Sequence, residues 1–181
     1  MDALIFLYIF GWALFIFILY TFEPRGYYWG RIRGYLAGPN NPEKTKEMIH
    51  QDIGRARKEV LVASCTADMS YWDEGVIKKI EVKASEKDGV RFTFVVGPEF
   101  NNVLLQNLAE ANENVSLRIL KEIPPCDFRI MDRNGTYTSN HGCEGASRRF
   151  FRTFGNIKAV QDRLEMFKQL YKQSSEYRRS A

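Results

Sequence analysis

The chain has 181 residues and a formal net charge of +4. This length suits one modest domain of roughly 100 to 150 residues plus a segment outside its core, and it excludes an array of several large domains. The positive charge is small and is not gathered into a concentrated basic stripe, so we do not expect nucleic acid as a partner.

The chain begins with a long apolar stretch. Residues 3–22 (ALIFLYIFGWALFIFILYTF) carry no charged side chain. At about 1.5 Å rise per residue, a helix of this length matches the ~30 Å hydrocarbon core of a bilayer. The stretch lacks the basic start and the small-residue cleavage site of a secretory signal, and it has no polar stripe. We therefore predict an uncleaved, single-pass transmembrane helix.

Residues 23–42 form a basic, aromatic juxtamembrane linker. Six of its side chains are predicted to lie at the membrane interface: Arg25, Tyr27, Tyr28, Trp29, Arg31 and Arg33. Arginines beside a span mark its cytoplasmic side, and only Asp2 and the amino terminus precede the span. The sequence therefore predicts an N-terminus outside, a cytoplasmic C-terminal domain, and the lipid bilayer as a partner.

Helical and strand patterns alternate from residue 43 onward. The patterns predict helices over 43–58, 73–87, 103–111 and 157–172. They predict strands over 59–65, 90–97, 115–120, 127–132 and 136–140. Residues 132–135 (DRNG) join the last two strands, and their Asn-Gly pair predicts a hairpin. Residues 150–154 are expected to be a helix or loop that buries its phenylalanines. The prediction is an α/β domain over 43–175 with a mostly parallel sheet, a terminal β-hairpin and a C-terminal helix.

The three cysteines do not form a recognisable framework. Cys65, Cys126 and Cys143 are odd in number, widely spaced and without a CxxC pair. This pattern argues against a set of disulfides and against a zinc site. We predict free thiols, no metal and no cofactor.

The order of the pieces resembles one half of the phospholipase D superfamily. The matching stretches are IHQDIGRARKEVLVAS, GVRFTFVVGP, NVSLRIL, PPCDFRIMDRNGTYTSN and RFFRTFGN, followed by an amphipathic helix. The resemblance implies an HxKxxxxD motif, in which the histidine is the nucleophile, and a GSxN-like stretch after it. It also implies that two such motifs, from two halves or two subunits, face each other around one phosphate.

The motif is degenerate in this chain. With Asp132 as the aspartate of the motif, the histidine position holds Pro125 and the lysine position holds Asp127. If Asp127 takes the histidine position instead, Arg129 takes the lysine position and Asp132 falls two residues short. Phosphoryl attack of this kind needs a nitrogen nucleophile and a cation beside it. Neither register supplies the nucleophile, which predicts a pseudoenzyme.

Two interpretations of the degenerate strand remain open. Period two places Phe128 on an apolar core side and Asp127 and Arg129 on a charged side, where the two charges pair with each other. Alternatively, Arg129 joins Ser139 and Asn140 in a vestigial phosphate pocket that binds an anion without cleaving it.

Three functions are compatible with the sequence. The favoured one is a membrane-anchored, catalytically inactive phospholipase D-like module, a binding or accessory subunit at the cytoplasmic face with a protein partner or a second copy of itself. The second is a phosphodiesterase acting on phospholipid or nucleic acid, with His141 as a displaced catalytic histidine. The third is a purely structural subunit of a membrane complex.

Overall fold

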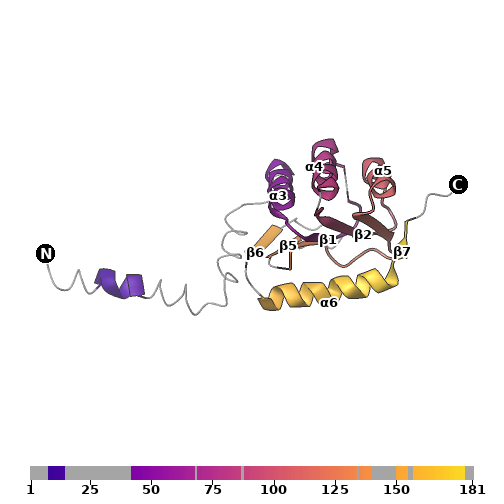
Figure 1. The fold of residues 1–181 in the computed structure, drawn as a ribbon. Coiled ribbons are helices and arrows are strands. Elements are labelled where there is room, and N and C mark those ends of the chain that lie inside the picture. The colour runs from indigo at the N-terminus through magenta and orange to yellow at the C-terminus, as the bar shows by residue number, and fades with distance from the viewer. Residues whose placement is uncertain are drawn as a thin grey trace.

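The computed structural model describes residues 8–14, 42–67, 69–86, 88–133, 135–139, 150–154 and 157–177. After a helical stretch at 8–14, the elements in chain order are α3 (Pro42–Arg55), β1 (Glu59–Ser64), α4 (Glu74–Ser85), β2 (Arg91–Val96), α5 (Val103–Ala111), β3 (Val115–Ile119), β4 (Phe128–Met131), β5 (Gly135–Ser139), β6 (Phe150–Phe154), α6 (Ile157–Gln173) and β7 (Ser175–Glu176). Figure 1 shows these elements as a layered α/β fold.

The strands form one sheet in the order β6-β5-β4-β1-β2-β3-β7. β1 pairs with β2 and β2 with β3 in parallel, whereas the other four neighbouring pairs are antiparallel. The sheet is therefore mixed, and the predicted mostly parallel sheet is wrong. The physical reason is that parallel strands need a crossover helix, and α4 and α5 supply such helices only between β1, β2 and β3.

The predicted hairpin is confirmed, and an additional strand extends it. β4 and β5 are antiparallel, with Met131 opposite Gly135. The turn uses positive φ angles at Asp132 (48°) and Arg133 (55°). Residues 150–154, expected to be a helix or loop, form strand β6 against β5. Aromatic and β-branched side chains favour strands, and β5 offers this segment an open edge.

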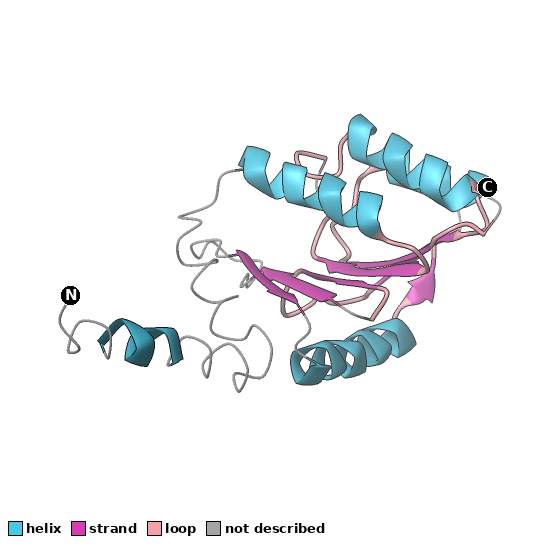
Figure 2. Cartoon of the chain, turned by 60° about the vertical axis from the view of Figure 1, so that its left-hand side comes forward, coloured by secondary structure: helices cyan, strands magenta, loops and turns pink. Residues whose placement is uncertain are grey.

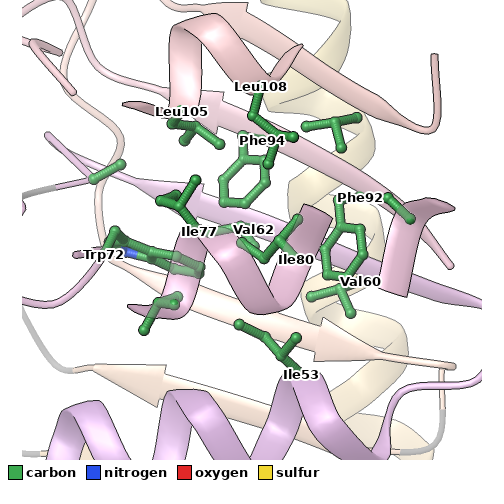
Figure 3. Close-up of a cluster of buried hydrophobic side chains, with 14 of the residues drawn as sticks. Ile53, Val60, Val62, Trp72, Ile77, Ile80, Phe92, Phe94, Leu105 and Leu108 are labelled. Carbon is green, nitrogen blue, oxygen red and sulfur yellow. The ribbon is translucent and has the colours of Figure 1, made fainter. Parts of the chain in front are cut away.

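Helices cover both faces of the sheet. Figure 1 shows α3, α4 and α5 on one face and α6 on the other, and Figure 2 shows helices on both sides of the sheet from a second direction. The larger core lies under α3, α4 and α5, where the Trp72 and Phe94 rings meet edge to face with centroids 5.2 Å apart (Figure 3). On the opposite face, Phe128 of β4 packs against Phe167 of α6. Burial on both faces is what stabilises the central strands.

The direction of α3 determines where the chain enters the domain. The helix ends at Arg55, just before β1 begins at Glu59. In its first half, Lys46 forms an ion pair with Asp73, whose carboxylate caps the start of α4. Because α4 begins just beyond the carboxyl end of β1, the first turns of α3 lie at that edge of the sheet. The chain preceding Pro42 therefore joins the domain at the carboxyl edge.

Candidate functional site

The segment predicted to carry the degenerate motif lies at the carboxyl ends of the parallel strands. The segment 120–127 connects β3 to β4, and β4 begins at Phe128 opposite Ala63 near the end of β1. At its start, the backbone N–H of Leu120 bonds the carbonyl of Val96 in β2. Open α/β sheets bind ligands outside the carboxyl ends of their strands. The two positions that would carry the catalytic pair, 125 and 127, are therefore at the expected edge.

Neither of these two positions offers the nitrogen nucleophile that the motif requires. Pro125 is exposed and has no ionisable group. Asp127 is half-buried, and its Oδ1 accepts a hydrogen bond of 2.6 Å from the backbone N–H of Cys65. The backbone is also closely packed here, since a Cβ at Gly97 would lie 2.4 Å from the carbonyl oxygen of Cys65. In the first register, the lysine position thus holds a carboxylate that ties β4 to the end of β1.

Arg129 lies inside the domain rather than on a charged surface. Its Nη2 forms an ion pair with Oδ2 of Asp52 on α3 at 3.2 Å, and the exposed fractions of the two side chains are 7% and 1%. The guanidinium carbon also lies 5.9 Å from the centre of the Trp72 ring. The predicted exposed pairing of Arg129 with Asp127 is therefore wrong. Because α3 covers this face of the sheet, a charge on it needs a counter-charge from the helix.

Asp132 has a structural role that the motif alone did not reveal. Its carboxylate accepts hydrogen bonds from the backbone N–H groups of Arg57, Lys58 and Glu59, at 2.9, 2.7 and 3.0 Å. These bonds fasten the β4–β5 turn to the connection between α3 and β1. Arg133 in the same turn forms an ion pair with Glu59.

Several predicted site residues fall outside the described side chains. Ser139 belongs to β5, where its backbone pairs with Phe150. Asn140 and His141 lie outside the described residues, as do the six interface residues of the linker. The anion pocket of Arg129, Ser139 and Asn140 therefore stays a prediction, and so does a catalytic His141.

The position of Asp52 in the sequence could have indicated its buried ion pair with Arg129. Asp52 lies on the apolar stripe of α3, three residues after Ile49 and four before Ala56. Both of these neighbours are buried, and Asp52 itself is fully buried. A carboxylate at such a position requires a partner inside the fold, which is Arg129.

The cysteines depart from the prediction in one case. Cys65 is disulfide-bonded, so its predicted free thiol is wrong, whereas Cys126 is a free, half-buried thiol. Burial raises the pKa of Cys126, against the lowering effect of the Arg163 guanidinium, and the charge of Asp127 raises it further. Cys143 lies outside the described residues. In the described ranges no group of three or more His, Cys, Asp or Glu side chains is placed to hold a metal ion.

The predicted transmembrane helix is described only in part. Residues 8–14 are helical, and five of their large apolar side chains are between 47% and 68% exposed: Tyr8, Ile9, Phe10, Trp12 and Leu14. Figure 1 draws this helix in indigo, apart from the α/β layers. Within the described residues, no helix has both the length and the apolar character needed to cross a bilayer.

The domain has the fold of phospholipase D family proteins. A phospholipase D family member, Nuc from Salmonella typhimurium, is 18% identical with a TM-score of 0.55, over 74% of this chain and 90% of Nuc. NucT from Helicobacter pylori is 11% identical with a TM-score of 0.59, over 75% of this chain and 92% of NucT. The sequence itself matches no family model and no curated protein.

One protein of similar fold binds DNA. TrmBL2, an archaeal chromatin protein with a novel mode of DNA binding, is 13% identical with a TM-score of 0.57, over 75% of this chain and 51% of TrmBL2. The expectation that nucleic acid is not a partner therefore gains no support from the comparisons.

Proposed function

We propose that this protein is a membrane-anchored, catalytically silent phospholipase D-like module that serves as a binding or accessory subunit. The fold supplies the phospholipase D-like part of this proposal. The absence of histidine and lysine at the predicted catalytic positions supports the proposed lack of catalysis. The apolar N-terminal stretch supports the proposed membrane anchor.

The observation that carries the proposal is the environment of the motif strand. In one register the catalytic positions hold Pro125 and Asp127, and the Asp127 carboxylate is engaged by the Cys65 backbone. In the other register the cation is Arg129, which is buried in an ion pair with Asp52. Phosphoryl transfer through histidine needs a nucleophile in line with phosphorus and a cation beside its oxygens. Neither register supplies that nucleophile.

We further propose a single span with the domain on the cytoplasmic side. Support comes from the uncharged run 3–22, from the exposed apolar side chains at 8–14, and from Arg25, Arg31 and Arg33 after the run. Protease added to sealed cells should leave the domain intact. Digestion of the domain would show that the orientation is opposite to the proposed one. The disulfide at Cys65 would then lie in an oxidising compartment, where disulfides are usually found.

Turnover is the direct test of the silent module. The detergent-solubilised full chain should release no nitrophenolate from bis(p-nitrophenyl) phosphate, with or without added metal. Turnover that disappears in His141→Ala would favour the phosphodiesterase with a displaced histidine. A Ser139→Ala variant is the matched control, because it alters the same predicted pocket without removing the imidazole.

Binding separates an accessory module from a purely structural subunit. Titration calorimetry with inorganic phosphate should show binding that is weakened by Ser139→Ala together with Asn140→Ala. Mild detergent extraction should recover a discrete complex containing the chain. A complex without phosphate binding would favour the structural subunit, and a lone homodimer with turnover would favour the enzyme.

A further inference from the structure

Three large apolar side chains are exposed along one edge of the sheet. Met69, Val103 and Ile123 have exposed fractions of 45%, 56% and 45%. Met69 follows β1, Val103 follows β2 and Ile123 follows β3. Because these three strands are parallel and adjacent, the segments that follow them meet at the carboxyl edge. We call Met69, Val103 and Ile123 the apolar rim.

Hydrogen bonds hold the segments of the apolar rim together. The buried Asn102, next to Val103, donates from Nδ2 to the carbonyls of Ala67 and Trp72, which flank Met69, at 3.2 and 2.9 Å. The same Asn102 caps α5 by accepting from the N–H of Leu105. The apolar rim is thus a fixed surface rather than a set of independent loops.

The segment that carries Ile123 is anchored to the same surface. Within the connection from β3 to β4, Asp127 accepts from the Cys65 backbone at 2.6 Å. Pro124, beside Ile123, is buried against Gly97, since a Cβ there would lie 3.3 Å from the proline Cδ. The rim and the motif positions 125 and 127 therefore share one edge.

The first described residue of the domain lies at this same edge. α3 begins at Pro42, and the ion pair of Lys46 with Asp73 places its first turns beside the start of α4. Pro42, the last residue of the predicted linker 23–42, consequently lies at the carboxyl edge of the sheet.

The charges at this edge favour a neutral lipid surface over an anionic one. Two exposed carboxylates, Glu99 and Glu122, flank the rim, and Lys121 is the exposed cation beside Glu122. Surfaces that recognise anionic lipid carry clusters of Lys and Arg, which the described residues of these segments lack. Contact here would come from apolar side chains entering the headgroup boundary.

We propose that the carboxyl edge of the sheet lies against the bilayer that holds the anchor, with the apolar rim in contact with zwitterionic lipid. This inference rests on the membrane anchor of the proposed function. The inference specifies which surface of the domain faces the membrane. In this orientation, the end of the candidate site at Asp127 faces the headgroup layer.

Quenching of tryptophan fluorescence by brominated lipid tests the proposal on the full chain. Val103→Trp probes the rim, and Val82→Trp is the matched control because Val82 is 58% exposed on α4, toward the opposite edge of the sheet. Both variants are reconstituted in phosphatidylcholine vesicles, with and without bromine near the headgroup end of the acyl chains. The signal added by Val103→Trp should be quenched, whereas the signal added by Val82→Trp should not.

The native Trp12 separates failure of the rim from failure of the anchor. In a Trp29→Phe background, with bromine placed near the end of the acyl chains, quenching that is lost on the further substitution Trp12→Phe shows that the anchor is in the bilayer. If that quenching is seen but the added tryptophans of Val103→Trp and Ile123→Trp remain unquenched, the rim proposal is overturned. If Trp12 is not quenched, the membrane anchor itself fails. Stronger rim quenching in phosphatidylserine vesicles would overturn the preference for neutral lipid.

Discussion

The guanidinium of Arg129 on β4 and the carboxylate of Asp52 on α3 form an ion pair at 3.2 Å in the interior of the domain. The two residues are 77 positions apart in the sequence. Their contact joins α3 to the strand that was predicted to carry the degenerate motif. It explains why a strand expected to expose one side is buried along its whole length.

Arg129→Met should strongly destabilise the domain, because Asp52 would lose its counter-charge in the interior. Breaking a buried pair from one side costs about 3 to 5 kcal/mol. Urea unfolding followed by circular dichroism measures the loss in the free energy of unfolding. The double variant Asp52→Asn with Arg129→Met should recover most of it, because no charge is left buried. A loss below ~1 kcal/mol in the single variant would contradict this role.

Asp132→Ala should destabilise the domain by at least ~2 kcal/mol, because hydrogen bonds to a charged acceptor contribute about 1.5 to 3 kcal/mol each. The positive φ at Asp132 adds to the cost, since alanine tolerates that region less well. Asp132→Asn is the informative control. It keeps Oδ1, which accepts from Lys58 and Glu59, and it tolerates positive φ, so its loss should be smaller. Equal losses in both variants would be inconsistent with the acceptor role.

Asp73 should give the domain a stability that falls at low pH. Burial raises the pKa of Asp73, but the hydrogen bonds from Lys46 and the Val76 N–H and the charges of Lys46 and His50 outweigh it, so the pKa lies below its ordinary value. A lowered carboxyl pKa stabilises the fold above the unfolded pKa of about 3.9, and this contribution disappears as pH falls through the folded value.

The Asp73→Ser variant isolates this effect because serine keeps an N-cap acceptor for α4 without the charge. The difference in unfolding free energy between the parent and Asp73→Ser should be present at pH 6 and should shrink below about pH 4. Asp73→Ala should lose about 1 kcal/mol more than Asp73→Ser, because it also removes the cap. A difference that does not change with pH would exclude the ion pair as its source.

Alkylation by iodoacetamide should distinguish Cys126 from Cys65. Cys126 should react without prior reduction, and its rate should rise at a higher pH than the ~8.5 of an ordinary thiol because its pKa is raised. Cys65 should be labelled only after reduction, because it is disulfide-bonded. Arg163→Gln should raise the pKa of Cys126 further, since the guanidinium Nη1 lies 3.5 Å from Sγ. Labelling of Cys65 without reductant, read by peptide mass spectrometry, would contradict the disulfide.

Local patterns were sufficient for most elements of the domain. Apolar spacing predicted the helices, and runs rich in valine and phenylalanine predicted the central strands, because each pattern depends only on a period of 3.6 or 2. The hairpin between β4 and β5 was predicted from the Asn-Gly pair in its connection, which is also a local signal. β6 was missed because arginines beside Phe150 and Phe151 obscured a strand whose formation depends on the open edge of β5.

The sequence by itself determined that positions 125 and 127 hold proline and aspartate rather than histidine and lysine, because residue identity needs no coordinates. Only the tertiary structure decided what the remaining charges do. Arg129 and Asp127 alternate with apolar residues as on an exposed strand, yet α3 covers that face and supplies Asp52. The backbone of Cys65 reaches Asp127, and three backbone N–H groups converge on Asp132. These partners are distant in sequence. The spacing of apolar residues along the chain does not indicate which helix will cover a face of the sheet or which loop will lie beside a carboxylate.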